Sequence, residues 1–237
     1  EQLPSFQSGL FYVQDPAAWL SVQCAGIGEG DRVLDCCSAP GGKSFAAAIC
    51  GAGQITSCDI HPHKIELLQK GAQRLGFTHI HALCKDATEF VPEWQEKMDV
   101  VIADVPCSGE GMFRKDEEAQ KQWSEDNVAL CEARQRRIIA DVWPSLARDG
   151  VLIYSTCTFN RYENDGNVRW MADELGAEPL FRDDVLVPGN GVIKTELGYS
   201  LVPGHVEGEG QYCSALRKKS DVEWREIKAR GMRPSKA

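Results

Sequence analysis

The sequence contains ten cysteines but no Cys-x-x-Cys pair, and this absence excludes the usual zinc-knuckle and thioredoxin sites. A chain of 237 residues can bury a core of its own and does not need disulfides to fold. Most of the cysteines also lie inside apolar runs that are strand-like or helix-like. We therefore expect reduced thiols, as in a cytoplasmic protein, and no bound metal.

Long apolar runs and a signal peptide are lacking as well. No uninterrupted apolar stretch reaches the roughly 18 residues that a bilayer-spanning helix needs. The first residues, EQLPSFQSGL, have neither a basic n-region nor an apolar h-region. An initiating Met is absent, which indicates a fragment or a trimmed chain. We expect a monomer in the cytoplasm that makes no contact with a membrane.

An excess of positive charge is also missing. The formal net charge is −9, which argues against non-specific binding of nucleic acid by the whole surface. The charge is unevenly distributed, because residues 214–237 contain eight Lys and Arg against three Asp and Glu. Such a run is typical of a solvated tail, and it could equally help to hold a polyanion. Composition leaves both interpretations open.

Strand-like and helix-like segments alternate along the chain, which predicts an α/β fold with a mostly parallel central sheet and helices on both faces. Short apolar runs between turn residues indicate the strands, and stripes of helical period indicate the helices. The expected strands are 31–35, 54–59, 79–83, 99–105, 151–155 and 211–216. The expected helices are 43–50, 61–76, 125–147 and 163–175, the third with a bend near Pro144.

Four carboxylates and two cysteines stand where the first five of these strands end. In chain order they are Asp35, Asp59, Asp86, Asp104, Cys107 and Cys157. In open α/β sheets, ligands bind outside the carboxyl ends of the strands. The sequence therefore predicts that these side chains share the edge of the sheet at which a ligand binds.

The turn after the first strand, CCSAPGGKS at 36–44, resembles two common phosphate motifs and satisfies neither. A P-loop needs a glycine where Cys37 stands, and the dinucleotide fingerprint GxGxxG also fails. A glycine-rich turn into a helix still lets a ligand approach the backbone closely. Asp59 lies about 20 residues beyond this turn, where an acidic residue commonly binds ribose hydroxyls, although Asp59 and Asp86 could be simple caps. A ligand with adenosine but no long phosphate chain fits, and S-adenosylmethionine is the natural candidate.

Cys107 and Cys157 differ from the other cysteines, which suit the role of small buried hydrophobes. In DVPCSGEG, Pro106 stops the strand and the following Ser-Gly turns the chain, so that Cys107 is exposed on a loop. Cys157 follows the end of the neighbouring strand. Two thiols that converge on a cofactor crevice suggest covalent catalysis, with packing alone as the alternative.

Three segments carry a family resemblance: DCCSAPGGKS, DVPCSGEGMFRK and YSTCTFNRYEN. They are similar to the DxCAAPGGKT, DxPCSG and YSTCT…EEN motifs of the RNA (cytosine-C5) methyltransferases of the Sun/Fmu class. The flanking segments QSGLFYVQDPAAWL and HVEGEGQYCSALRK resemble those of bacterial 16S ribosomal RNA enzymes of the RsmF/YebU type. Three motifs in the right order, over nearly the whole chain, are far more specific than any one of them. Cys36 and Ser38 stand where the family usually has Leu and Ala, and Cys36 is expected to pack rather than react.

The resemblance implies a Rossmann-like class I S-adenosylmethionine-dependent methyltransferase. It implies a catalytic domain at 25–219, an N-terminal extension at 1–24 that packs on it, and a basic tail at 220–237 leading to a missing RNA-binding region. The implied cofactor site consists of Cys37, Ser38, Ala39, Pro40, Gly41, Gly42, Lys43, Asp59, Asp86 and Asp104. Within it, Asp59 takes the ribose, Asp86 lies near the adenine and Asp104 lies between the cofactor and the target base. Cys157 is the implied nucleophile, and Cys107 is the cysteine that helps to release the product.

The implied reaction is methylation of cytosine C5 in RNA through a covalent bond between Cys157 and C6, with 16S ribosomal RNA as the favoured substrate. The cytosine must leave its stack to reach the thiol, so we expect it to be unpaired or flipped. A transfer RNA substrate, a DNA cytosine methyltransferase in which Cys107 attacks, and a non-catalytic RNA-binding or assembly factor remain alternatives. The candidates for phosphate contact are Arg114, Lys115, Lys121, Arg134, Arg136, Arg137 and the C-terminal tail. For the arginines of 125–147, a solvated helix face is the alternative.

Overall fold

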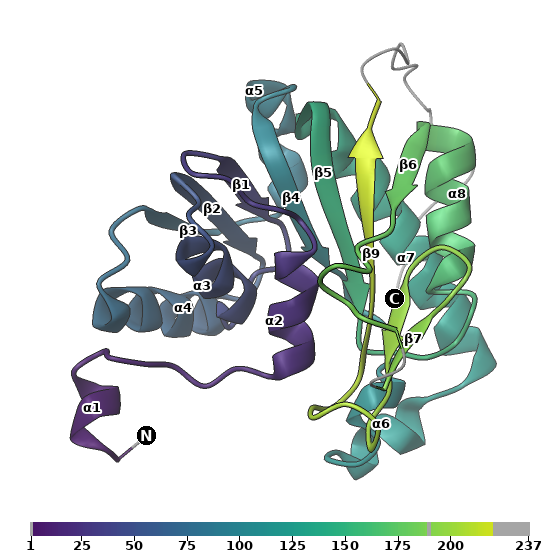
Figure 1. Ribbon diagram of the computed structural model, residues 1–237, viewed down its shortest axis with the longest axis horizontal. Coiled ribbons are helices and arrows are strands. Elements are labelled where there is room, and N and C mark those ends of the chain that lie inside the picture. The colour runs from purple at the N-terminus through teal and green to yellow at the C-terminus, as the bar shows by residue number, and fades with distance from the viewer. Residues whose placement is uncertain (1, 189–190, 220–237) are drawn as a thin grey trace.

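The apolar runs between turn residues form the strands of a mixed sheet in the computed structural model, which describes residues 2–188 and 191–219 (Figure 1). The strands are β1 (Arg32–Asp35), β2 (Gln54–Asp59), β3 (Ile80–Cys84), β4 (Met98–Asp104), β5 (Leu146–Thr156), β6 (Ala177–Leu180), β7 (Val192–Lys194), β8 (Tyr199–Leu201) and β9 (Gln211–Lys218). Their order is β3-β2-β1-β4-β5-β9-β8-β7, with β6 paired to β9 outside this row. The first five strands are parallel, and β9 runs antiparallel to β5. The predicted α/β fold with a mostly parallel central sheet is confirmed.

Helices cover both faces of the sheet, as predicted. They are α1 (Pro4–Gln7), α2 (Pro16–Gln23), α3 (Gly42–Ile49), α4 (Pro62–Leu75), α5 (Val91–Trp94), α6 (Glu117–Gln122), α7 (Glu125–Val142) and α8 (Asp165–Leu175). Short 3-10 turns occur at η1 (Ala87–Phe90), η2 (Glu110–Met112) and η3 (Trp143–Ser145). Along β4, Val101 and Ala103 pack in the core that α7 and α8 share, whereas Val100 and Ile102 pack in the core of α2 and α3. This alternation explains why the strand is apolar throughout.

The long predicted helix over 125–147 is wrong at its end. α7 stops at Val142, Trp143–Ser145 forms a 3-10 turn, and β5 begins at Leu146, well before the predicted strand at 151–155. Pro144 has no N–H to continue a helix, and its ring excludes the helical partner. The Leu146 carbonyl instead accepts a hydrogen bond from the Lys218 ammonium at 2.6 Å. Residues 146–147 of the expected helix therefore belong to β5. Their structure is decided by long-range strand pairing, which local periodicity does not reveal.

The N-terminal residues cross the lower edge of the molecule, from α4 to α2, in Figure 1. Arg74 of α4 donates hydrogen bonds to the carbonyls of Phe6 (2.5 Å) and Phe11 (3.0 Å), and Ala17 and Val22 of α2 lie in the core. The boundaries of the N-terminal extension and of the catalytic domain stay predictions. The predicted basic tail at 220–237 lies outside the described residues. Of the helices that the structure describes, none has the length and apolar character needed to cross a bilayer.

Candidate functional site

The turn between β1 and α3 is held in shape by backbone hydrogen bonds and by the small size of its residues. Ser38 donates from both its backbone N–H and its hydroxyl to the Cys58 carbonyl of β2, at 3.0 and 3.1 Å. Gly41 has a φ of 112°, a conformation that favours glycine. A Cβ at Gly41 would also lie 2.8 Å from the Phe45 ring and 2.9 Å from Leu68. The sequence PGGKS therefore forms a tight turn that delivers the Lys43 side chain at the start of α3.

Asp35, at the end of β1, is completely buried beneath this turn. Its carboxylate accepts a hydrogen bond from the Ser44 hydroxyl at 2.7 Å, and its other oxygen has no partner among the described residues. Burial raises the pKa of Asp35 to about 7, although the Ser44 hydrogen bond and the charge of Lys43 act in the opposite direction. Asp35 therefore supports the turn from below rather than facing a ligand.

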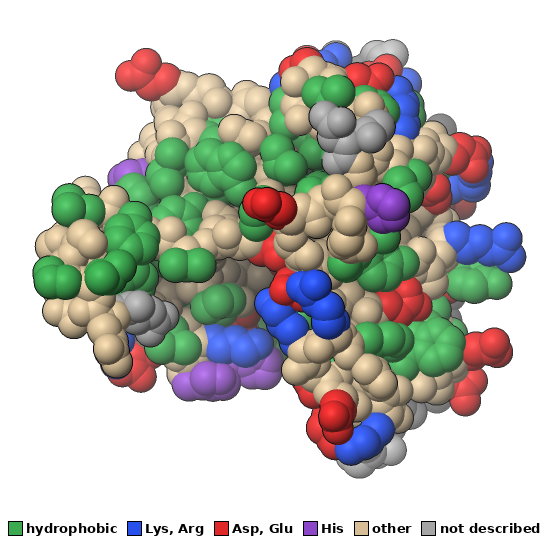
Figure 2. All heavy atoms as spheres, turned by 60° about the horizontal axis from the view of Figure 1, so that its bottom comes forward, with side chains coloured by type: hydrophobic (Ala, Val, Ile, Leu, Met, Phe, Trp, Pro, Cys, Tyr) green, Lys and Arg blue, Asp and Glu red, His purple; other side chains and the backbone are tan. Residues whose placement is uncertain are grey.

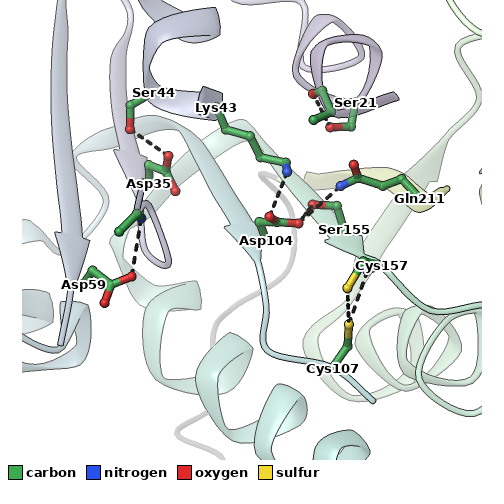
Figure 3. Close-up of polar contacts among 12 residues, drawn as sticks. Ser21, Asp35, Lys43, Ser44, Asp59, Asp104, Cys107, Ser155, Cys157 and Gln211 are labelled. Atoms are coloured by element: carbon green, nitrogen blue, oxygen red, sulfur yellow. Dashed lines mark hydrogen bonds and ion pairs between the residues drawn. The ribbon is translucent and has the colours of Figure 1, made fainter. Parts of the chain in front are cut away.

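Asp59 ends β2 beside the same turn and makes contacts that suit both of its expected roles. One carboxylate oxygen lies 3.4 Å from the Ala39 backbone nitrogen (Figure 3). The other accepts a hydrogen bond from the His61 N–H at 2.9 Å. α4 nevertheless begins after His61 without a side-chain cap. Asp86 follows β3, where its carbonyl accepts a hydrogen bond from the Glu89 N–H at the start of η1. The charge of Asp86 helps to raise the pKa of Cys58, which places this carboxylate near the end of β2 as well.

Asp104, at the end of β4, connects the turn to the thiols. Its Oδ2 forms an ion pair with the Lys43 ammonium at 2.7 Å, and its Oδ1 accepts hydrogen bonds from Ser155 (2.6 Å) and Gln211 (3.2 Å) (Figure 3). The Lys43 side chain is almost fully buried, whereas that of Asp104 is partly exposed. Lys43 thus reaches from α3 across the site, which the sequence did not indicate. Ser155 and Gln211 were also missed, because nothing in their local sequence marks a carboxylate partner.

Cys107 and Cys157 lie side by side, as the predicted parallel pairing of their strands requires. Their sulfur atoms are 3.1 Å apart, and the Cys157 N–H lies 3.3 Å from the Cys107 sulfur (Figure 3). The hydrogen bond from the Cys107 thiol lowers the pKa of Cys157, and the Lys43 charge also lowers it, against burial and the charge of Asp104. The same interaction, together with burial, raises the pKa of Cys107. The directions of these two pKa shifts favour Cys157 as the thiolate of the pair and Cys107 as its hydrogen-bond donor.

A buried polar frame holds the loop that carries Cys107. Glu163 is fully buried, and its carboxylate accepts hydrogen bonds from the Ser108 N–H (3.0 Å), from Gln135 (2.6 Å) and from Asn160 (2.7 Å). Gln135 of α7 also donates to the Pro106 carbonyl at 2.9 Å. The loop therefore carries hydrogen bonds on both sides of Cys107, and its thiol has a defined position.

Gln14 is a residue at this site that the sequence did not single out. Its Oε1 accepts a hydrogen bond from the Tyr12 hydroxyl at 2.5 Å, and burial raises the pKa of Tyr12 to about 12, so the phenol stays protonated as the donor. This contact fixes the amide so that Nε2 is the free end. Nε2 is buried, has no acceptor among the described residues, and lies 3.5 Å from where a Cβ on Gly42 would stand. The one available signal was its place in QSGLFYVQDPAAWL, a segment noted only for its family resemblance.

The other sequence candidates divide into two groups. All ten cysteines are free thiols, and Cys36 is buried in the core as expected. The prediction that Cys84 is a buried hydrophobe is wrong, because Cys84 is exposed at the end of β3. Within 2–188 and 191–219, no three His, Cys, Asp or Glu side chains could hold a metal. Arg114 and Lys115 form ion pairs with Glu209 near the thiols. On α6, Lys121 forms an ion pair with Glu118. On α7, Arg137 lies near Asp141 and Arg134 is exposed. Arg136, also on α7, binds Glu132 of the same helix and Asn167 of α8. Arg136 therefore serves helix packing, and the others stay candidates for phosphate contact.

The chain is similar to known proteins of one family. The family model "16S rRNA methyltransferase RsmB/F" matches residues 23–217. Ribosomal RNA small subunit methyltransferase F of Cronobacter sakazakii is 34% identical, over 91% of this chain and 46% of its own. The probable ribosomal RNA small subunit methyltransferase B of Bacillus subtilis is 37% identical, over 90% of this chain and 49% of its own. The chain thus spans about half the length of these curated relatives.

A solved structure is similar to the fold as a whole. NSun6 from Pyrococcus horikoshii, crystallised with SFG, has a TM-score of 0.81 and 26% identity over 93% of this chain and 56% of its own. SFG is an analogue of S-adenosylmethionine. The Rossmann-like class predicted for the sheet is confirmed by this likeness, and the predicted family resemblance is confirmed by the sequence matches.

Proposed function

We propose a function from the premise that this chain belongs to the 16S rRNA methyltransferase RsmB/F family. It transfers a methyl group from S-adenosylmethionine to C5 of a cytosine in RNA, with 16S ribosomal RNA as the favoured substrate. The names of its relatives support the class of substrate, and the two thiols support C5 of cytosine as the acceptor. A ribosomal substrate agrees with a protein that works in the cytoplasm.

The observation that carries the proposal is the thiol pair at the ends of β4 and β5. Cytosine C5 is a poor nucleophile until a thiolate has added at C6. One sulfur of the pair has a lowered pKa and the other a raised pKa, so a nucleophile and a proton donor lie 3.1 Å apart. A scaffold protein on the same fold has no need of this arrangement beside Asp104 and Lys43.

The residues around the turn fit S-adenosylmethionine. Asp59 offers a carboxylate to the ribose at the end of β2, and Asp86 lies one strand further towards the expected adenine. Gln14 offers a buried amide donor with no acceptor, beside Gly42 at the N-terminus of α3, where a carboxylate is favoured. We therefore assign the methionine carboxylate to Gln14 and the turn at 37–43. When bound, the cofactor supplies a methyl group on a positively charged sulfur.

The chain's own residues then account for the remaining chemistry. The Cys157 thiolate forms a bond to C6, and the electron pair of the C5–C6 double bond makes C5 nucleophilic towards the methyl group. Asp104, fixed by Lys43 and Ser155, accepts a hydrogen bond from the cytosine amino group, and from N3 only when that nitrogen carries a proton. A water molecule accepts the C5 proton, the C5–H electron pair restores the C5–C6 double bond, and the C6–S bond breaks with its electron pair returning to Cys157. The Cys107 thiol stabilises that departing thiolate through the hydrogen bond it already donates.

The two substitutions Cys107→Ser and Cys157→Ser test this proposal. Cys107→Ser keeps the nucleophile but loses the thiol that assists release, so we expect a protein–RNA adduct that survives denaturing electrophoresis. Cys157→Ser should form no adduct and transfer no methyl group. Cys50→Ser, half-buried at the far end of α3, is the matched control. Bisulfite sequencing of host RNA with and without the gene identifies the modified cytosine.

Each alternative has its own outcome in these experiments. Modification of transfer RNA alone would replace the ribosomal substrate. An adduct trapped by Cys157→Ser rather than Cys107→Ser would make Cys107 the nucleophile, as expected of a DNA cytosine methyltransferase. Calorimetry without measurable binding of S-adenosylmethionine would favour the non-catalytic assembly factor.

A further inference from the structure

Three loops meet directly beside the nucleophile, and Gly111 is the point of contact. Its N–H donates to the Cys157 carbonyl at 2.7 Å. A Cβ at Gly111 would lie 2.8 Å from the Cys157 carbonyl oxygen and 3.2 Å from that of Glu209. The loop that follows Cys107 is therefore pressed against both the Cys157 loop and the loop before β9. Whatever side chains these loops present to solvent lie next to the place where the target cytosine must enter.

Two aromatic side chains lie by these loops, Phe159 after Cys157 and Trp123 directly after α6, and one carboxylate holds both of their segments. Glu110 accepts hydrogen bonds from the Trp123 indole N–H at 3.1 Å and from the Phe159 backbone N–H at 2.7 Å. The Phe159 ring packs against Gly210, where a Cβ would lie 2.4 Å from the ring. Phe159 and Trp123 are each 37% exposed, and neither belongs to a core cluster. An aromatic ring that is held by protein contacts on one side and exposed to solvent on the other can stack on a base.

Two cationic side chains lie on the loop that follows Cys107, and both bind the same carboxylate oxygen of Glu209. Arg114 and Lys115 both contact Glu209 Oε1, at 2.7 and 3.0 Å, and their side chains are 64% and 53% exposed. Asp15 holds the Glu209 backbone N–H at 2.8 Å, so the anchor itself is fixed. One carboxylate neutralises one of two positive charges and leaves donors directed to solvent. Figure 2, which brings the lower edge of Figure 1 forward, shows a hollow on this face with Lys and Arg side chains at its border.

We propose that Phe159, Trp123, Arg114 and Lys115 form a binding subsite for the nucleotide next to the target cytosine in single-stranded RNA. The neighbouring base stacks on the two rings, and a flanking phosphate binds the two cations. The inference rests on the function proposed above and adds the part of the substrate that is recognised. Removing a cytosine from its stack leaves its neighbour with an uncovered face, and a protein ring next to the nucleophile covers that face. A protein partner would not require two exposed rings and two exposed cations beside the Cys157 loop.

A double-substitution cycle between protein and RNA tests the stacking. The probe is a labelled single-stranded RNA with one cytosine flanked by adenosines. Two further RNAs each carry one abasic site, one of them directly before the cytosine and the other directly after it. Dissociation constants are measured by fluorescence anisotropy with S-adenosylhomocysteine present. We expect Phe159→Ala to weaken binding of the intact RNA at least about fivefold. Binding of the abasic RNA that lacks the stacked base should hardly change, because that RNA has no base to stack on Phe159. Phe159→Trp should restore binding, because it keeps a stacking face.

Phe181→Ala is the matched control, since Phe181 is 43% exposed but packs against Tyr199 and Lys194, among the residues around β6 to β8. Equal losses with intact and abasic RNA, or a loss no larger than that of Phe181→Ala, overturn the inference. For the cations, Arg114→Gln and Lys115→Gln should each reduce the salt dependence of binding by the equivalent of about one phosphate contact. Unchanged salt dependence in both variants overturns the phosphate half.

Failure of the subsite and failure of the function are distinguishable. Adduct formation by Cys107→Ser reports the chemistry and does not depend on Phe159. If the adduct forms but the cycle shows no coupling, only the subsite is wrong. If no RNA yields an adduct but the cycle shows coupling, the protein recognises single-stranded RNA without the proposed reaction. Melting temperature and S-adenosylhomocysteine affinity, both expected to be unchanged, show that each variant is folded.

Discussion

Cys36 and Cys37 are neighbours in the chain, whereas Cys107 and Cys157 are 50 residues apart and meet only because β4 pairs with β5. Both pairs lie at the carboxyl edge of the sheet. Cys36 is buried, and its contact with Cys37, its burial and the charge of Asp35 all raise its pKa. Cys157 has a thiol donor and the Lys43 ammonium nearby, and its pKa is lowered. We therefore expect Cys36 to be unreactive and Cys107 and Cys157 to form the reactive pair.

The surroundings of the two pairs explain the difference. Around Cys36, the turn at 36–43 is shaped by backbone hydrogen bonds and by glycines, and it offers main-chain groups to a ligand. Around Cys107 and Cys157, buried side chains position two sulfur atoms. We infer that the turn recognises the cofactor and that the thiol loops carry the chemistry. Four experiments separate these two roles.

The largest effect is expected when the two pairs are compared directly. Cys157→Ser should reduce methyl transfer by roughly 10³-fold or more, because a serine hydroxyl is not ionised where a thiolate was. Cys36→Ala should keep nearly full activity, since that thiol only packs. Methyl incorporation into RNA measures both. Near-normal turnover by Cys157→Ser would contradict the assignment of the nucleophile.

Removing the polar frame of the thiol loops should cost stability. Glu163→Ala leaves the Ser108 N–H and the Gln135 and Asn160 amides without their acceptor, at a cost of about 3 kcal/mol in the free energy of unfolding. Urea denaturation monitored by fluorescence measures it. Glu93→Ala, an exposed carboxylate on α5, is the control and should change little. A Glu163→Ala protein as stable as the control would show that the frame does not support the loop.

Gln14→Leu should weaken recognition on the cofactor side only. Loss of a hydrogen bond to a carboxylate predicts about tenfold weaker binding of S-adenosylhomocysteine by calorimetry. Methylthioadenosine lacks that carboxylate, so its affinity should be the same for the variant and the parent protein. Gln7→Leu, exposed on α1, is the control. Equal losses for both ligands would place Gln14 away from the methionine end.

The smallest effect concerns the protonation of Cys157. Cys107→Ala removes the donor that lowers the pKa of Cys157, so the pKa should rise back towards its ordinary value. The thiolate fraction at neutral pH then falls, and alkylation of Cys157 by iodoacetamide should slow several-fold and reach its midpoint at higher pH. Mass spectrometry of the labelled peptide follows the reaction, with Cys36 as an internal unreactive thiol. An unchanged midpoint would mean that the two sulfurs are not coupled.

The sequence predicted the parts of this protein that depend on local pattern. Apolar runs located β1 and β2 within a residue, and Gly76 ends α4 in the left-handed conformation expected of a cap. The rule that ligands bind at strand ends brought Asp59, Asp104 and Cys157 to one edge. The end of α7 could not be predicted in this way, because the pairing of Leu146 with Met98 is decided far along the chain.

The residue types of the site and their order along the chain were determined by the sequence itself, since motif spacing and strand periodicity are properties of neighbouring residues. Only the tertiary structure decided which groups meet. It set Lys43 on Asp104, brought the Cys107 and Cys157 sulfur atoms within 3.1 Å of each other, and left Gln14 with a buried amide beside Gly42. Ion pairs and hydrogen bonds depend on distance in space, and a pKa depends on burial and on nearby charge. These quantities exist only once the strands have been brought together.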